Sequence, residues 1–94
     1  MNTIDLQSRP ALAARVRLQI DATTGNAVLL YPEGLVELNA TAHEIIARCD
    51  GAATVEKIVS ALGAEFETSG DELRRDVLAC LHELQRQNLI ALAS

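Results

Sequence analysis

Residues 29–58 constrain the fold of this chain more than any other stretch of its sequence. The stretch begins in an apolar run, passes through Pro32-Glu33-Gly34, which suits a type I turn, and continues into helical patterns with capping residues. A strand hairpin followed directly by capped helices is typical of a small α+β unit. No part of it has the residue types or spacing of a catalytic centre, which indicates a binding module.

Short segments of the N-terminal half have the composition of strands. Residues 16–20 alternate apolar and polar side chains, as a half-buried strand does. Residues 27–31 are apolar throughout, which is expected of a central strand covered on both faces, and residues 35–38 form a third segment. Turn-forming residues at 21–26 and 32–34 separate them. We therefore predict a three-stranded antiparallel meander with its first and third strands at the edges.

Capping residues place the ends of three predicted helices. Thr41 and Glu44 have the spacing of a capping box with Thr41 as the N-cap, and Gly51 is expected to end that helix. Thr54 is expected to cap the second helix and Ser69 the third. Each helix then presents one apolar stripe to the core. The stripes are Ala42, Ile45, Ile46 and Cys49, then Val55, Ile58, Val59, Leu62 and Phe66, then Leu73, Val77, Cys80, Leu81 and Leu84.

The order of these elements defines the expected fold class. A three-stranded antiparallel meander followed by three helices, the last ending near Gln87, predicts a winged helix-turn-helix-like α+β domain. Residues 89–92 are expected to add a short terminal strand. Residues 1–13 are weakly patterned and contain Pro10, so we expect a flexible N-terminal arm there and a single binding domain over residues 14–92.

The charge balance excludes some classes of partner. The 94 residues include 13 acidic and 8 basic side chains, a net charge of −5, whereas nucleic-acid binding requires a clustered excess of Lys and Arg. The N-terminal residues lack the basic and apolar regions of a signal peptide, and no apolar stretch approaches about 18 residues. We therefore expect a cytoplasmic protein that binds neither nucleic acid nor membrane.

No residue pattern indicates chemistry at a metal or a nucleophile. Cys49 and Cys80 lack CxxC spacing, and we expect both to be reduced core thiols. His43 and His82 fall on solvated helix faces, and no glycine-rich phosphate loop occurs. The sequence therefore predicts a protein that is not an enzyme and carries no metal or cofactor.

One apolar residue of the last helix falls outside its core stripe. Leu78 lies about 110° from the centre of that stripe, and Arg74, His82 and Gln85 are its helical neighbours. An apolar side chain bordered by hydrogen-bonding groups could line a peptide groove. It could equally pack under the N-terminal arm or remain exposed.

The third predicted strand favours the groove. Leu35, Val36, Glu37 and Leu38 form a short edge without an internal proline or lysine, and the unpaired backbone groups of such an edge can accept a further strand. The arm or a second copy of the chain could cover the same edge. If a peptide binds there, a proline at Val36 or the change Leu78→Asp is expected to abolish binding.

Several short motifs together resemble one family. They are Leu29-Leu30-Tyr31-Pro32-Glu33-Gly34, Leu38-Asn39 followed by Thr41-Ala42 and Ile45-Ile46, Cys49-Asp50-Gly51, and Thr54-Val55 followed by Ile58. Together with Arg9-Pro10 and residues 16–19, these motifs resemble coenzyme PQQ synthesis protein D (PqqD). The resemblance covers about residues 9–92. The chain lacks the tryptophan expected in many relatives near Ile20 and Ala27. We interpret the motif residues themselves mostly as scaffold, with Asp50 ordering a loop.

The resemblance implies a peptide chaperone of pyrroloquinoline quinone (PQQ) biosynthesis. Such proteins bind the precursor peptide PqqA and present it to the radical SAM enzyme PqqE, which cross-links a glutamate and a tyrosine of the peptide. The resemblance also implies the fold of recognition domains in other modified-peptide pathways, where a leader peptide adds a strand beside the third strand and packs against the third helix. The implied peptide-binding residues are Leu35, Val36, Glu37, Leu38, Arg74, Leu78, His82 and Gln85.

A winged-helix DNA-binding regulator is the alternative function. Its recognition helix would be residues 71–87, where acidic side chains outnumber arginines and would oppose the phosphates. A homodimer, formed through the sheet edge or by exchange of arms, is compatible with the peptide-binding function.

Overall fold

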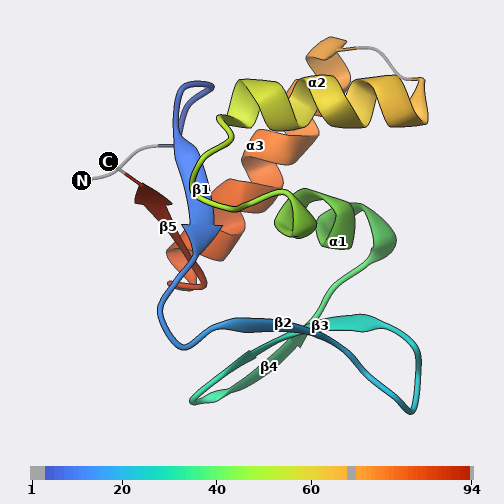
Figure 1. The fold of residues 1–94 in the computed structure, drawn as a ribbon, viewed down its shortest axis with the longest axis vertical. Coiled ribbons are helices and arrows are strands. Elements are labelled where there is room, and N and C mark those ends of the chain that lie inside the picture. Colours follow the sequence, from blue (N-terminus) through green and yellow to red (C-terminus); the bar gives the residue numbers. More distant parts are fainter. Residues whose placement is uncertain (1–3, 68–69, 94) are drawn as a thin grey trace.

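The computed structural model describes residues 4–67 and 70–93 of the chain (Figure 1). Within these residues the elements are β1 (Arg9–Leu12), β2 (Arg17–Ile20), β3 (Ala27–Tyr31), β4 (Gly34–Glu37), α1 (Ala40–Ala47), α2 (Val55–Phe66), α3 (Gly70–Arg86) and β5 (Ile90–Ala93). The helices lie on one side of the sheet that β2, β3 and β4 form, and β1 lies beside β5. The core fills the space between the helices and one face of this sheet.

The strands β2, β3 and β4 form the predicted antiparallel meander, with β3 in the centre. Leu29 lies opposite Leu18 on one neighbouring strand and Val36 on the other, so these side chains share a face of the sheet. That face points to the helices, because Leu29 is fully buried within the main core cluster. The predicted fold class is confirmed.

The strands β1 and β5 form a second sheet, which the sequence did not predict. Arg9 pairs with Ala93 and Leu12 pairs with Ile90, in antiparallel register. The strand expected near residues 89–92 is therefore confirmed. The expectation of a flexible arm over residues 1–13 is wrong for residues 9–12, which form β1. The four residues of β1 show no alternation of apolar and polar side chains, and their partner strand lies near the other end of the chain.

Backbone hydrogen bonds tie the segment before β1 to the start of α2. The carbonyl oxygen of Leu6 accepts a hydrogen bond from the N–H of Glu56 at 3.0 Å. The carbonyl oxygen of Ser8 accepts one from the N–H of Val55 at 2.9 Å. Both donors belong to the first turn of α2, where the helix itself offers no acceptor. Because Pro10 is also fully buried, this segment belongs to the folded domain.

Asn39 caps α1, which therefore begins earlier than predicted. The side chain of Asn39 accepts a hydrogen bond from the N–H of Ala42 at 2.7 Å. Thr41 is not the N-cap, because it lies inside the helix, whereas Asn39 has the extended backbone that an N-cap requires. Thr54 is confirmed as the cap of α2, where its Oγ1 accepts a backbone N–H at 3.2 Å. The predicted cap at Ser69 lies outside the described residues.

Gly51 does not end α1. That helix ends at Ala47, and Gly51 lies in the connection to α2 with a left-handed φ of 81°. A Cβ atom at this position would lie 3.5 Å from the Cβ of Ala11, and the N–H of Gly51 donates to the carbonyl oxygen of Pro10 at 3.0 Å. The glycine therefore allows this connection to pass close to β1.

We expect Asn39→Ala to lower the free energy of unfolding by about 1 kcal/mol, because it removes the side-chain acceptor at the start of α1. Thr41→Ala is the matched control and is expected to change this free energy by less than about 0.5 kcal/mol. Urea denaturation followed by circular dichroism measures both. Equal losses for the two variants would contradict the assignment of the cap.

The apolar stripes of the helices form the core largely as predicted. Every residue of the predicted stripes is buried or half-buried except Phe66, which is 45% exposed. Phe66 is the last residue of α2, so it lies beyond the covered part of the helix. Its assignment to the core is wrong.

Candidate functional site

The strand β4 forms an edge of its sheet, with no strand on its outer side among the described residues. In an antiparallel pair, directly opposite residues alternate between hydrogen-bonded and non-hydrogen-bonded positions. The N–H of Leu38 donates to the carbonyl oxygen of Ala27 at 2.9 Å, so the register makes Val36 a bonded position as well. The backbone groups of Leu35 and Glu37 therefore point away from β3, toward the open edge.

The side chains of the predicted residues on this edge divide between the two faces of the sheet. Val36 is half-buried against the core, and Leu38, which follows β4, is a core residue with 7% exposure. Leu35 is 58% exposed, and Glu37 is exposed as well. Leu35 and Glu37 thus have backbone groups at the open edge and accessible side chains, whereas the side chains of Val36 and Leu38 pack toward the core.

The predicted residues of α3 are covered to different degrees. His82 is exposed, while Arg74, Leu78 and Gln85 are half-buried. Leu78 packs against the margin of the core, so part of its side chain contributes to the packing of the domain. The sequence had left open whether this residue packs, lines a groove or is exposed. Arg74 donates from Nη1 to Asp71 at 3.1 Å, but its Nε is buried without a hydrogen-bond partner among the described residues.

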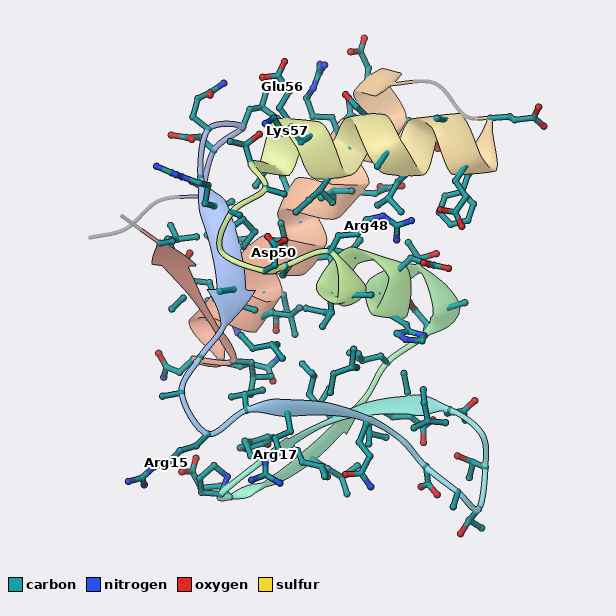
Figure 2. The ribbon with its side chains drawn as sticks, viewed as in Figure 1. Arg15, Arg17, Arg48, Asp50, Glu56 and Lys57 are labelled. Atoms are coloured by element: carbon teal, nitrogen blue, oxygen red, sulfur yellow. The ribbon has the colours of Figure 1, made fainter. Side chains whose placement is uncertain are left out.

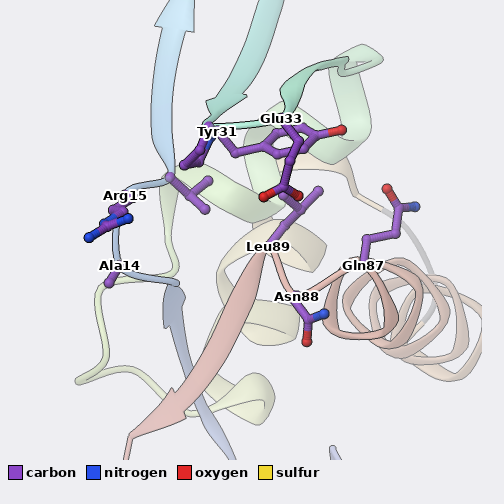
Figure 3. Close-up of a pocket in the computed structure, with 9 residues that line it drawn as sticks. Ala14, Arg15, Tyr31, Glu33, Gln87, Asn88 and Leu89 are labelled. Atoms are coloured by element: carbon purple, nitrogen blue, oxygen red, sulfur yellow. The ribbon is translucent and has the colours of Figure 1, made fainter.

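A hollow of about 300 Å³ lies where the turn after β3 meets the end of α3 (Figure 3). Its lining comes from the β1–β2 link, the β3–β4 turn and the turn between α3 and β5. The ring of Tyr31 and the side chain of Leu89 form apolar walls, and the carboxylate of Glu33 lies over them. No sequence pattern predicts this hollow, because separate connections of the chain assemble it.

The Cys49-Asp50-Gly51 motif orders the connection between α1 and α2. The carboxylate of Asp50 accepts hydrogen bonds from the N–H of Ala53 at 3.0 Å and from the N–H of Ala52 at 2.9 Å. These two bonds hold the pKa of the Asp50 carboxyl below its ordinary value. This motif is therefore structural, as we interpreted it from the sequence.

The cysteines lie in environments that suppress thiolate formation. Cys49 is buried, its Sγ lies 3.2 Å from the carbonyl oxygen of Ile45, and burial raises the pKa of its thiol to about 12. Burial also raises the pKa of the half-buried Cys80. Both are poor nucleophiles at neutral pH. The described residues hold no cluster of three or more side chains that could bind a metal ion.

Four basic side chains labelled in Figure 2 are spread over the molecule. Arg15 lies just before β2, Arg17 is the first residue of β2, Arg48 lies at the end of α1 and Lys57 in α2 (Figure 2). Arg48 is already held in ion pairs with a glutamate of α1 and a glutamate of α2. These four residues therefore form no continuous basic face of the kind that phosphates require. In the described part of the chain, every helix is too short or too polar to cross a bilayer.

Comparison with known proteins assigns the family. A profile of the family described as "Coenzyme PQQ synthesis protein D (PqqD)" matches residues 26–90. This chain belongs to the PqqD family. Two relatives named "PqqA binding protein" come from Xanthomonas oryzae pv. oryzae (strain KACC10331 / KXO85) and Xanthomonas campestris pv. campestris (strain 8004). Each is 39% identical over 92 residues, which cover 98% of this chain and 100% of the relative.

Solved structures of PqqD proteins share the fold. The solution NMR structure of the PqqD truncation of Methylobacterium extorquens PqqCD has a TM-score of 0.83 at 27% identity, over 95% of each chain. That protein is described as a functional and stand-alone recognition element for ribosomally synthesized and post-translationally modified peptides. The crystal structure of PqqD from Xanthomonas campestris is 40% identical with a TM-score of 0.56, over 93% of this chain and 98% of that chain. The resemblance found in the sequence is confirmed.

Proposed function

We propose that this chain is a peptide chaperone of PQQ biosynthesis that binds the precursor peptide PqqA along the open edge of β4. The observation that carries the proposal is the outward-pointing backbone at Leu35 and Glu37, on an edge with no proline to block a partner. Relatives at 39% identity are named for PqqA binding, and the M. extorquens domain is a described recognition element. Both support a binding role for the same fold.

An added strand would gain affinity from the main chain of β4 and specificity from α3. Peptide residues beside Leu35 and Glu37 would exchange hydrogen bonds with their free N–H and C=O groups. The peptide side chains that point toward the helices would meet the α3 face that carries Leu78 and His82. Arg74 would donate from Nε to a peptide carbonyl once its side chain turns outward, because this nitrogen has no partner among the described residues.

Presentation to PqqE completes the proposed role. The chain holds the peptide, and we place the cross-linking chemistry on the radical SAM enzyme, in the cytoplasm. The raised pKa values of both cysteine thiols support a role without catalysis. A titration of PqqE with the chain, with and without bound PqqA, tests presentation. We expect the complex to bind PqqE more tightly than the free chain.

A second copy of the chain would compete with the peptide for the same edge. Open antiparallel edges can pair across a two-fold axis. Where such a homodimer forms, the apparent affinity for PqqA falls as the protein concentration rises. The alternative of DNA binding is disfavoured by the scattered basic residues, and a salt-sensitive gel shift would be its signature.

Isothermal titration calorimetry with synthetic PqqA and a scrambled peptide tests peptide binding. We expect a Kd of about 10 µM or tighter for PqqA, with a negative heat-capacity change from apolar burial, and no measurable binding of the scrambled peptide. Absence of binding, both alone and with PqqE present, would contradict the proposal. His82→Ala is a better probe of the α3 face than Leu78→Asp, because Leu78 also packs against the core.

A further inference from the structure

The hollow between the β3–β4 turn and the end of α3 combines apolar walls with one unpaired carboxylate. Leu89 is 1% exposed and lines the hollow together with the half-buried Tyr31. The carboxylate of Glu33 lies over this apolar surface and forms no hydrogen bond or ion pair with any described residue (Figure 3). Such a place suits a ligand with an aliphatic stem and a positively charged head.

The other polar side chains around the hollow are directed elsewhere. The amide nitrogen of Gln87 donates to the carboxylate of Glu83 at 3.2 Å. Arg15 extends away from the hollow toward solvent, as Figures 2 and 3 both show. Asn88 points away from the carboxylate of Glu33 in Figure 3. Glu33 is therefore the charged group positioned to recognise a ligand here.

The hollow lies at the end of the sheet where β4 begins. The open-edge backbone of β4 begins at Leu35, and Glu33 precedes it by two residues, in the turn between β3 and β4. A peptide strand that pairs with β4 and continues past Leu35 would pass the end of the hairpin that carries Glu33. On the far side of the hollow, the lining includes the turn between α3 and β5, Gln87 to Leu89.

We propose that this hollow is a subsite for a lysine or arginine side chain of the bound peptide, with Glu33 as its counter-ion. This inference rests on the proposed binding of PqqA along β4. The aliphatic stem of the basic residue packs against Tyr31 and Leu89, and its charged head meets the Glu33 carboxylate at the mouth. The subsite sets the register of the peptide, because only one basic side chain can occupy it while the main chain pairs with β4.

Calorimetry with paired changes in protein and peptide tests the subsite. The proteins are the wild type, Glu33→Gln, and Asp76→Asn as a matched change of one negative charge on an exposed site of α3. The ligands are PqqA and versions in which each lysine or arginine is replaced in turn by norleucine. We expect one replacement to weaken binding to the wild type by about threefold to tenfold and to have no effect on Glu33→Gln. Asp76→Asn should behave as the wild type.

Further arms separate this inference from the proposed function. Arg15→Gln is expected to leave PqqA affinity unchanged. If Arg15→Gln instead binds PqqA more weakly and Glu33→Gln binds it more tightly, the hollow is a site for an anion and the inference is overturned. Equal affinity of Glu33→Gln and the wild type for PqqA would also overturn it. In both cases the wild type still binds PqqA, and the proposed function stands. Failure of the wild type to bind PqqA at all would remove both.

Discussion

Removal of residues 1–12 is expected to abolish the cooperative unfolding transition of this protein. The deletion takes away β1, the only partner of β5 within the described residues, and with it Leu12, which lies opposite Ile90, a residue with 4% exposure. It also removes the buried Pro10 and the carbonyl groups that cap the first turn of α2. These losses together are comparable with the total stability of a domain of this size, about 5–10 kcal/mol.

Thermal denaturation of the chain of residues 13–94, followed by circular dichroism, measures this effect. We expect a broad, non-cooperative change, and we expect a synthetic peptide of residues 1–12 to restore a cooperative transition when added in excess. Gly51→Val offers a point change with the same target, because its side chain would press on Ala11 at a left-handed φ. If the truncated chain melts cooperatively near the wild-type temperature, β1 is a dispensable arm after all.

Glu37→Pro is expected to weaken PqqA binding by at least about 30-fold while leaving the fold intact. The N–H of Glu37 points to the open edge, so proline removes a donor to the added strand without breaking a bond to β3. Val36→Pro, the change that the sequence alone suggests, would instead remove a hydrogen bond between β4 and β3. A loss of binding by that variant could then result from a loss of folding. Calorimetry measures the affinity, and the unfolding temperature verifies the fold.

The opposite edge of the same sheet provides a matched control. The N–H of Asp21 donates to the carbonyl oxygen of Asn26 at 2.8 Å, so the same alternation places the N–H of Ile20 on the outer side of β2. Ile20 is 51% exposed, and Ile20→Pro is expected to change PqqA affinity by less than about threefold. Glu37→Gln keeps the backbone donor and should also bind PqqA nearly as the wild type does. Equal losses for Ile20→Pro and Glu37→Pro would contradict the choice of β4.

The elements that the sequence predicted correctly are those that local patterns determine. The meander follows from tight turns between apolar segments, and the helices follow from stripes at a period of 3.6 residues. The strand β1 was missed because its pairing with β5 is non-local and its four residues carry no period. The choice between Asn39 and Thr41 as a cap depends on where the backbone leaves the extended conformation, and side-chain chemistry alone does not specify this point.

The candidate site was predictable only in outline. Strand order identifies β4 as an edge, but the direction of each backbone group depends on the register with β3, which the sequence does not state. Helical periodicity selects Leu78 as a residue outside the main stripe, yet the structure packs it against the core margin. The hollow at Glu33 depends on three connections that only the tertiary fold brings together.

Amide hydrogen exchange of β4 with and without PqqA, resolved by residue with NMR, tests the central claim most directly. In the free protein we expect fast exchange at Leu35 and Glu37, whose N–H groups face solvent, and slow exchange at Val36, which bonds to β3. On saturation with PqqA, Leu35 and Glu37 should become protected, while Ile20 on the opposite edge stays fast. If Leu35 and Glu37 exchange as fast in the saturated complex as in the free protein, the peptide is not an added strand on β4.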